Sequence, residues 1–200
     1  SSPDSLFIVY TGSAGGRHSI RHFLEALRQL ARDREVPSES IRVEFVGTLG
    51  SEDLTVAKST PGVVVTPFQT HATAIQKMLS ADVLLVVNAI ASREALTGKL
   101  FEYIAAGRPV LALTHPGLLS RFIENERLGW SVVPDDCTAI KHLLKELLQL
   151  KKSGALASFG PSPELIARFD RRQAAQRLAG ILTFITSPPY FLSKAGANGA

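Results

Sequence analysis

The sequence predicts an α/β fold, with a mainly parallel sheet of about six strands and helices on both faces. Short apolar runs alternate along the chain with longer segments whose apolar residues recur at helical spacing. Such alternation indicates right-handed βαβ units and therefore a parallel sheet. The stretch Asp82–Val87, DVLLVV, also contains an uninterrupted apolar run, which is typical of a central parallel strand covered on both faces.

Each strand is expected where a short apolar run occurs between turn-forming residues. The expected strands are Leu6–Tyr10, Ile41–Gly47, Gly62–Pro67, Asp82–Val87, Pro109–Leu113 and Trp130–Pro134. The helices are expected where apolar residues repeat every three or four positions. They cover residues 20–31, 51–58 (a short helix or turn), 70–80, 98–106, 118–126, a segment lined by residues 140–148, and a final helix over about 163–185.

Several residues mark where these elements begin and end. Asp135 or Asp136 is placed to cap the helix that carries Ile140. Gly107 is expected to end the preceding segment in a left-handed conformation, and Pro109 prevents its continuation. We therefore interpret residues 1–186 as one domain with a terminal helix, and residues 187–200 as a frayed tail.

Composition limits the function classes. The chain has 200 residues, of which 45% are hydrophobic and 20% charged, and these proportions are typical of a globular domain. The single cysteine cannot form an internal disulfide and favours a reducing compartment, so we expect a cytoplasmic protein. The net charge of +4 is compatible with a location at the cytosolic face of a membrane. Zinc-finger spacing and interleaved basic and aromatic residues do not occur, so nucleic acid is not an expected partner.

Ligands of parallel sheets bind beyond the carboxyl ends of the strands, so the loops there are the candidate sites. The first is TGSAGGRHS, residues 11–19, whose three glycines lie between a strand and a helix. Its backbone could approach a phosphate that Arg17 also reaches, or the loop could be a tight turn with a surface arginine. A second loop, TPFQTH, carries Phe68, which could pack against a flat base or belong to the edge of the core.

The third loop leads into the segment SREALTGKLFEYIAAGRPVLAL, residues 92–113. Thr97 and Gly98 lie at an expected helix start, where free amides can bind an anion, and Lys99 adds a positive charge. Glu102 lies on the same helix face and could accept hydrogen bonds from a ribose diol, while Glu94 could reach a second polyol. A surface pair between Lys99 and Glu102, with Glu94 solvated, is the structural alternative.

This segment resembles the hallmark region of retaining glycosyltransferases with the GT-B fold, especially glycosyltransferase family 4. The hallmark is two glutamates separated by seven residues, then a helix rich in small residues, Gly-x-Pro and a strand. The stretches FIVYTGS, RVEFVGT, HATAIQKMLSADVLLVV, GWSVVPDD and FDRRQAAQRLAGIL resemble other parts of that domain in order. The resemblance covers Leu6 to about Ile185.

The resemblance implies a carboxy-terminal, Rossmann-like donor domain, one half of a GT-B enzyme of the hexosyltransferase type. It implies a metal-independent reaction without a cofactor, in which a nucleotide-diphosphate sugar is the donor substrate. Glu94 would be the catalytic residue that contacts the transferred sugar, and Glu102 would hold the ribose. The other substrate-binding residues that it implies are Gly12, Ser13, Arg17, Val65, Phe68, Thr97, Gly98 and Lys99. The amides around Thr97, Gly98 and Lys99 would hold the diphosphate, and Val65 and Phe68 would lie near the base.

The sequence departs from the family pattern at the first turn. The family often carries an arginine after the glycine of this turn and a lysine soon after, whereas here Ser13 follows Gly12 and the nearest base is Arg17. The resemblance also implies an amino-terminal acceptor domain that this chain lacks, so the chain alone is expected to bind donor weakly and transfer nothing. The complete enzyme would build a glycan, polysaccharide or glycolipid; a GT-B sugar-nucleotide epimerase and a non-catalytic nucleotide-binding or assembly module are the alternatives.

Overall fold

The chain forms two units, Ser1–Ser162 and Pro163–Ala200, and each is described by itself. The computed structural model describes residues 4–16, 20–37, 39–89 and 94–186. The first unit contains a sheet in the order β3-β2-β1-β4-β5-β6, in which every neighbouring pair is parallel. Its strands are β1 (Leu6–Ala14), β2 (Ile41–Leu49), β3 (Val63–Thr66), β4 (Val83–Val87), β5 (Val110–Leu113) and β6 (Gly129–Val132). The predicted fold class is confirmed.

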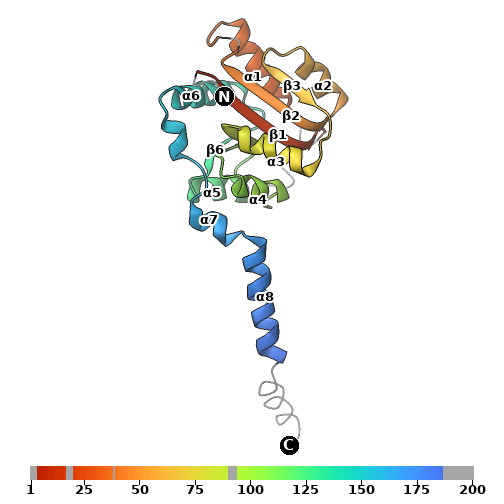
Figure 1. The fold of residues 1–200 in the computed structure, drawn as a ribbon. Coiled ribbons are helices and arrows are strands. Elements are labelled where there is room, and N and C mark those ends of the chain that lie inside the picture. Colours follow the sequence, from red (N-terminus) through yellow and green to blue (C-terminus); the bar gives the residue numbers. More distant parts are fainter. Residues whose placement is uncertain (1–3, 17–19, 38, 90–93, 187–200) are drawn as a thin grey trace, which may run out of the picture. The chain divides into compact units, whose positions relative to one another are not determined.

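Helices cover both faces of this sheet (Figure 1). The helices of the first unit are α1 (Arg21–Arg32), α2 (Ser51–Lys58), α3 (His71–Ser80), α4 (Gly98–Ala105), α5 (Leu118–Asn125) and α6 (Cys137–Lys152), with a 3₁₀ turn, η2 (Ala155–Ser158). Helices α1, α2 and α6 pack on one face, where they share a core with β1, β2, β4 and β5. Helices α3, α4 and α5 contact β1, β4 and β5 from the other face.

Burial follows from the period of two along each strand. Leu6, Ile8 and Tyr10 of β1 point into the core shared with α1 and α6, and each is at most 1% exposed. All five residues of β4 are buried because this central strand is covered on both faces. Burial of this apolar area is the main favourable term in folding. The continuous apolar run in the sequence was therefore a reliable sign of a central strand.

The first two strands are longer than the sequence predicted. Residues 11–14, expected to begin a glycine-rich loop, continue β1 and pair in register with residues 46–49 of β2. The reason is a matched pair of glycines, Gly12 and Gly47, with φ of +112° and +136°. A Cβ at Gly47 would lie 2.1 Å from the carbonyl oxygen of Gly12. These glycines therefore permit a close approach of two strands rather than a turn.

The predicted helix boundaries agree well with the structure. Asp136 is the residue that caps α6, and its carboxylate accepts a hydrogen bond from the amide of Ala139 at 2.9 Å. Gly107 follows α4 with φ of +67°, the left-handed conformation that the sequence predicted. Thr70 caps α3 by accepting from the amide of Thr73.

The second unit contains two helices where one was expected. Helix α7 (Pro163–Arg168) ends before Asp170, and α8 (Arg171–Thr186) begins after it. The Asp170 carboxylate accepts from the amide of Arg172 at 2.8 Å, because a short acidic side chain competes well for free amides at a helix start. The predicted tail, residues 187–200, lies outside the described residues.

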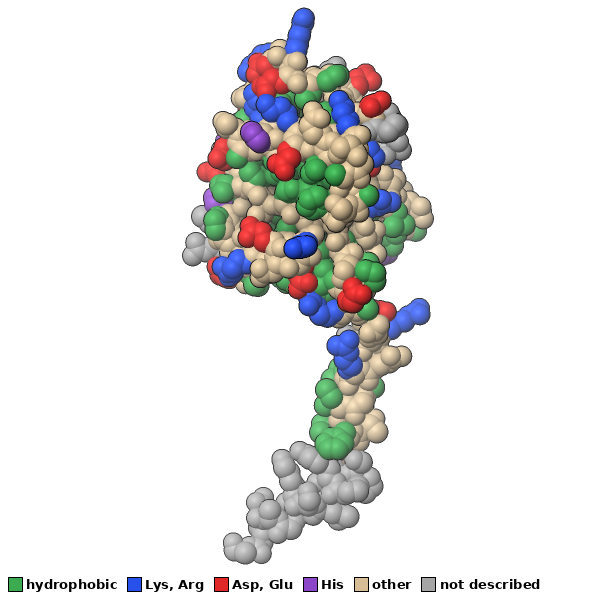
Figure 2. All heavy atoms as spheres, turned by 90° about the vertical axis from the view of Figure 1, so that its left-hand side faces the viewer, with side chains coloured by type: hydrophobic (Ala, Val, Ile, Leu, Met, Phe, Trp, Pro, Cys, Tyr) green, Lys and Arg blue, Asp and Glu red, His purple; other side chains and the backbone are tan. Residues whose placement is uncertain are grey.

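Charges of both signs lie side by side on the face that Figure 2 shows. Figure 2 shows Lys and Arg side chains interspersed with Asp and Glu on the visible face of the first unit. On α1, Arg21 lies 3.8 Å from Glu52, and Arg32 lies 3.4 Å from Asp33. None of the helices within the described ranges has the length and apolar character needed to cross a membrane.

Candidate functional site

The candidate site lies where the strand order reverses, between β1 and β4. The ladder between these strands pairs Ile8 with Val83 and Val9 with Leu84, although β1 continues to Ala14. Beyond the ladder, the Tyr103 hydroxyl accepts from the amide of Thr11 at 3.1 Å and donates to the carbonyl of Leu85 at 3.1 Å. The Tyr103 side chain, from α4, thus bridges β1 and β4 where the two strands form no direct backbone hydrogen bond. The two strands part there, as expected of a crevice at a switch point.

A hollow of about 370 Å³ lies at this crevice. It is lined by Tyr10, Ser13, Val87, Thr97, Gly98, Lys99 and Glu102. Five of these residues were predicted from the sequence to bind substrate: Ser13, Thr97, Gly98, Lys99 and Glu102. A sixth predicted residue, Gly12, lies against the end of the Lys99 side chain. The structure therefore brings residues from the first strand and from α4 together, although almost ninety positions separate them.

Lys99 is the central charge of this hollow. Its ammonium donates to the Tyr10 hydroxyl at 2.7 Å and lies 4.4 Å from the centroid of that ring. Among the described residues no carboxylate lies within ion-pair distance of it, so the surface pair with Glu102 considered above is not formed. Burial lowers the pKa of Lys99 below its ordinary value of 10.5. The carboxylate of Glu102 acts in the opposite direction, but the effect of burial is the larger one. A half-buried cation that forms no ion pair among the described residues is suited to an anionic ligand.

The start of α4 adds further positive character. The first amides of any helix have no acceptor within it and carry partial positive charge. Thr97 precedes α4 but makes no capping bond, and its hydroxyl oxygen is buried without a hydrogen-bond partner. Gly98 has nothing within 4 Å of the position of a Cβ, so space is open in front of the helix. The amides and the Lys99 ammonium thus converge on one hollow.

The two glutamates lie in different surroundings. Glu102 lines the hollow, one turn of α4 beyond Lys99. Glu94 is 65% exposed and does not line it; the Arg121 guanidinium, from α5, lies 3.3 Å from its carboxylate. Sequence reasoning missed Arg121. Arg121 lies near the start of the helix that follows β5, which is at the carboxyl edge of the sheet where ligands bind. This position in the sequence could have identified it.

Two predicted residues lie away from the hollow. Val65 of β3 packs against the core, and Phe68, just beyond that strand, is 79% exposed. Neither lines the hollow at β1 and β4. Arg17 lies outside the described residues.

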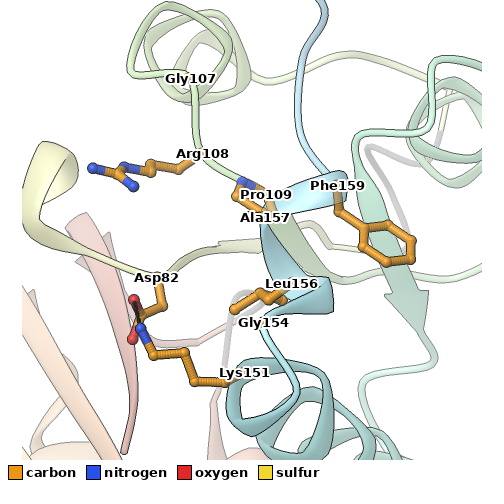
Figure 3. Close-up of a pocket in the computed structure, with 9 residues that line it drawn as sticks. All are labelled: Asp82, Gly107, Arg108, Pro109, Lys151, Gly154, Leu156, Ala157 and Phe159. Carbon is orange, nitrogen blue, oxygen red and sulfur yellow. Dashed lines mark hydrogen bonds and ion pairs between the residues drawn. The ribbon is translucent and has the colours of Figure 1, made fainter. Parts of the chain in front are cut away.

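A second hollow lies at the opposite edge of the sheet, where β4 and β5 begin (Figure 3). It has a volume of about 290 Å³. Its charged groups already have partners within the protein, because Lys151 lies 2.8 Å from Asp82 and Arg108 donates to the carbonyl of Leu79. The amino ends of parallel strands are also not where ligands bind in such sheets. The hollow at β1 and β4 is therefore the stronger candidate.

From the backbone conformation and close contacts of Gly12 we predict how its replacement changes the stability of the fold. Gly12→Ala should lower the free energy of unfolding by roughly 2 to 3 kcal/mol, because alanine is strained at φ of +112°. Its Cβ would also meet the end of Lys99, whose Cε lies at 2.5 Å. Gly107→Ala is the control, with φ of +67° and nothing within 4 Å, and should cost about 1 kcal/mol. Urea unfolding measures both; equal losses would contradict the close approach at Gly12.

Known structures share this fold. WaaG, a glycosyltransferase involved in lipopolysaccharide biosynthesis, is 21% identical with a TM-score of 0.60, and the match covers 92% of this chain and 48% of WaaG. A putative UDP-N-acetylglucosamine 2-epimerase from Listeria monocytogenes is 15% identical with a TM-score of 0.61, over 92% of this chain and 46% of the epimerase. The chain thus spans about half the length of these proteins.

A third similar structure is a domain by itself. The C-terminal domain of the glycosyl transferase group 1 family protein LpcC from Francisella tularensis is 16% identical with a TM-score of 0.52. The match covers 76% of this chain and 83% of that domain. No match was found among curated protein sequences. The family model described as glycosyl transferases group 1 matches residues 5–150, well over half of the sequence, and the chain therefore belongs to that glycosyltransferase family.

Proposed function

We propose that this chain is the donor-binding domain of a retaining glycosyltransferase whose donor is a nucleotide-diphosphate sugar. The diphosphate lies in the hollow between β1 and β4, held by Lys99 and the first amides of α4. Glu102 accepts hydrogen bonds from the ribose hydroxyls, and Glu94 contacts the transferred sugar. An amino-terminal domain, of the kind that the resemblance implies, carries the acceptor. The proposal includes hexosyl transfer into a glycan, polysaccharide or glycolipid.

One observation carries this proposal: a half-buried ammonium without an ion-pair partner among the described residues lines the hollow at the switch point. Phosphate oxygens would replace the water that now solvates its remaining N–H groups. Charge-assisted hydrogen bonds of this kind are about twice as strong as neutral ones. In a transfer reaction the same groups would stabilise the departing nucleoside diphosphate, since negative charge develops on it as the bond to the sugar breaks.

The proposal predicts binding without a metal ion. The chain should bind at least one of UDP, GDP, ADP and CDP in isothermal titration calorimetry, and the affinity should be unchanged by a chelator. The corresponding nucleoside should bind far more weakly, because it offers no phosphate to Lys99. Failure of all four diphosphates to bind at millimolar concentration would refute the proposal.

A sugar-nucleotide epimerase is the second candidate. The Listeria epimerase has nearly the same TM-score as WaaG, and such distant likeness concerns the fold alone. Both candidates bind the nucleotide, so the products of the complete enzyme distinguish them. A transferase releases one nucleoside diphosphate for each sugar transferred, with the anomeric configuration kept, whereas an epimerase changes the sugar. The chain of 200 residues alone should catalyse neither reaction, and measurable transfer by it would contradict the proposed need for an acceptor domain.

A further inference from the structure

Tyr10 occupies an unusual place at the end of the buried part of β1. Its ring is 1% exposed and lies 5.8 Å from the ring of Phe45, centroid to centroid, inside the core. Its hydroxyl nevertheless reaches the hollow, which Tyr10 helps to line. Burial raises the pKa of this hydroxyl above its ordinary range, so it keeps its proton at neutral pH.

The direction of the hydrogen bonds follows from that proton. The Tyr10 hydroxyl has one proton and donates it to the carbonyl of Ser13 at 2.6 Å. It can therefore only accept from Lys99, whose ammonium lies 2.7 Å away. An ammonium has three N–H groups, and one is used in this bond. The other two have no hydrogen-bond acceptor among the described residues and are left for a ligand in the hollow.

The same hydroxyl connects two segments that are distant in the sequence. Through Ser13 it holds the end of β1, and through Lys99 it holds the start of α4. The Ser13 hydroxyl in turn accepts from Thr48 at 2.8 Å, which adds a side-chain contact between the ends of β1 and β2. Gly12 lets the lysine lie flat against the end of β1, since any Cβ there would displace Nζ, 2.6 Å away.

We propose that Tyr10 is a positioning residue of the diphosphate site: its hydroxyl holds the Lys99 ammonium over the end of β1, so that two N–H groups face the ligand. This inference rests on the proposed function for its ligand, but the placement of Lys99 by Tyr10 can be tested without one. In this arrangement α4 supplies the cation beside the end of β1, from across the crevice. A lysine without this hold would lose conformational freedom on binding and would bind phosphate more weakly.

The test is Tyr10→Phe, which keeps the ring in the core and removes only the hydroxyl. Without the hydroxyl as its acceptor, the Lys99 ammonium is solvated better in open water than in its half-buried position. It should therefore move away from the ring at position 10. Nuclear magnetic resonance of ¹³C-labelled lysine should show this directly, with the Lys99 signal assigned by its loss in Lys99→Met. In the wild type the ε-protons of Lys99 should be shifted upfield by the Tyr10 ring. In Tyr10→Phe both that shift and the pKa of Lys99 should return towards those of an ordinary lysine.

The affinity for nucleoside diphosphate should fall up to about tenfold in the same variant, because the freed lysine side chain must be ordered when the ligand binds. Unchanged Lys99 signals in Tyr10→Phe would overturn the inference, even if the affinity fell, because the role of Tyr10 would then be structural. Unchanged affinity would overturn it as well. If the wild type bound no nucleoside diphosphate, the proposed function would fail, while the Lys99 signals would still decide whether Tyr10 positions the lysine.

Discussion

Replacing Lys99 by methionine should weaken nucleoside diphosphate binding about 100-fold, the effect of losing roughly 2.7 kcal/mol of charge-assisted hydrogen bonding. Methionine fills a similar volume against Tyr10 and Gly12 but offers no N–H group to a phosphate. The fold should be retained, because the change removes one hydrogen bond, to Tyr10, and no ion pair among the described residues. Lys152→Met, at an exposed position near the end of α6, is the matched control. Calorimetry that gave equal affinities for Lys99→Met and the wild type would contradict the role of this lysine.

The pH dependence of binding gives a second measurement on the same residue. The charged form of Lys99 binds the diphosphate, and burial lowers the pKa of Lys99 in the free protein below 10.5. As the pH rises, the affinity of the wild type should therefore start to fall at a lower pH than it would if the binding lysine were fully exposed. Bound phosphate favours the charged form, so binding in that range should take up a proton. In Lys99→Met this component of the pH dependence should disappear.

Glu102→Ala should weaken nucleoside diphosphate binding about 10- to 100-fold, because two hydrogen bonds from ribose hydroxyls to a carboxylate are lost. Its effect should differ in kind from that of Lys99→Met. Inorganic pyrophosphate lacks a ribose, so Glu102→Ala should not weaken its binding and should strengthen it slightly by removing a negative charge from the hollow, while Lys99→Met should weaken it. Glu146→Ala, on the exposed side of α6, serves as the control.

The 2′-deoxy form of the bound nucleotide sharpens this experiment. The wild type should bind it less tightly than the ribonucleotide, and Glu102→Ala should bind the two forms alike. If the variant still distinguished the two forms as the wild type does, the 2′-hydroxyl would be held by another residue. Glu102 would then not hold the ribose diol as proposed, although it lines the hollow.

The architecture was predictable because it depends on local patterns. The apolar run of β4, the helical repeat of α6 and the left-handed Gly107 each follow from a few neighbouring residues. The break before α8 was not predicted, since the apolar repeat continues through it and a single capping aspartate, Asp170, decides it. Gly12 was expected in a loop, either a phosphate-binding one or a tight turn, because only the parallel register shows that Gly12 lies opposite Gly47.

The site could be predicted in outline from the sequence. Lys99 and Glu102 were identified because they lie at a helix start, where spacing alone indicates their common face. The roles of Tyr10 and Tyr103 were not predicted, since both contacts join residues about ninety positions apart. In the sequence Tyr10 is the end of an apolar strand and Tyr103 is part of a helical face. Only the crossing of α4 over the end of β1 brings their hydroxyls to the crevice.

A nucleoside diphosphate is proposed to bind in the hollow between β1 and β4, and amide chemical shifts locate it most directly. The ¹⁵N-labelled chain would be titrated with whichever of the four diphosphates binds. The account predicts the largest changes at Gly12, Ser13, Gly98 and Lys99, at the carboxyl edge of the sheet. Changes concentrated instead at Gly107 and Gly154, around the hollow of Figure 3, would contradict it.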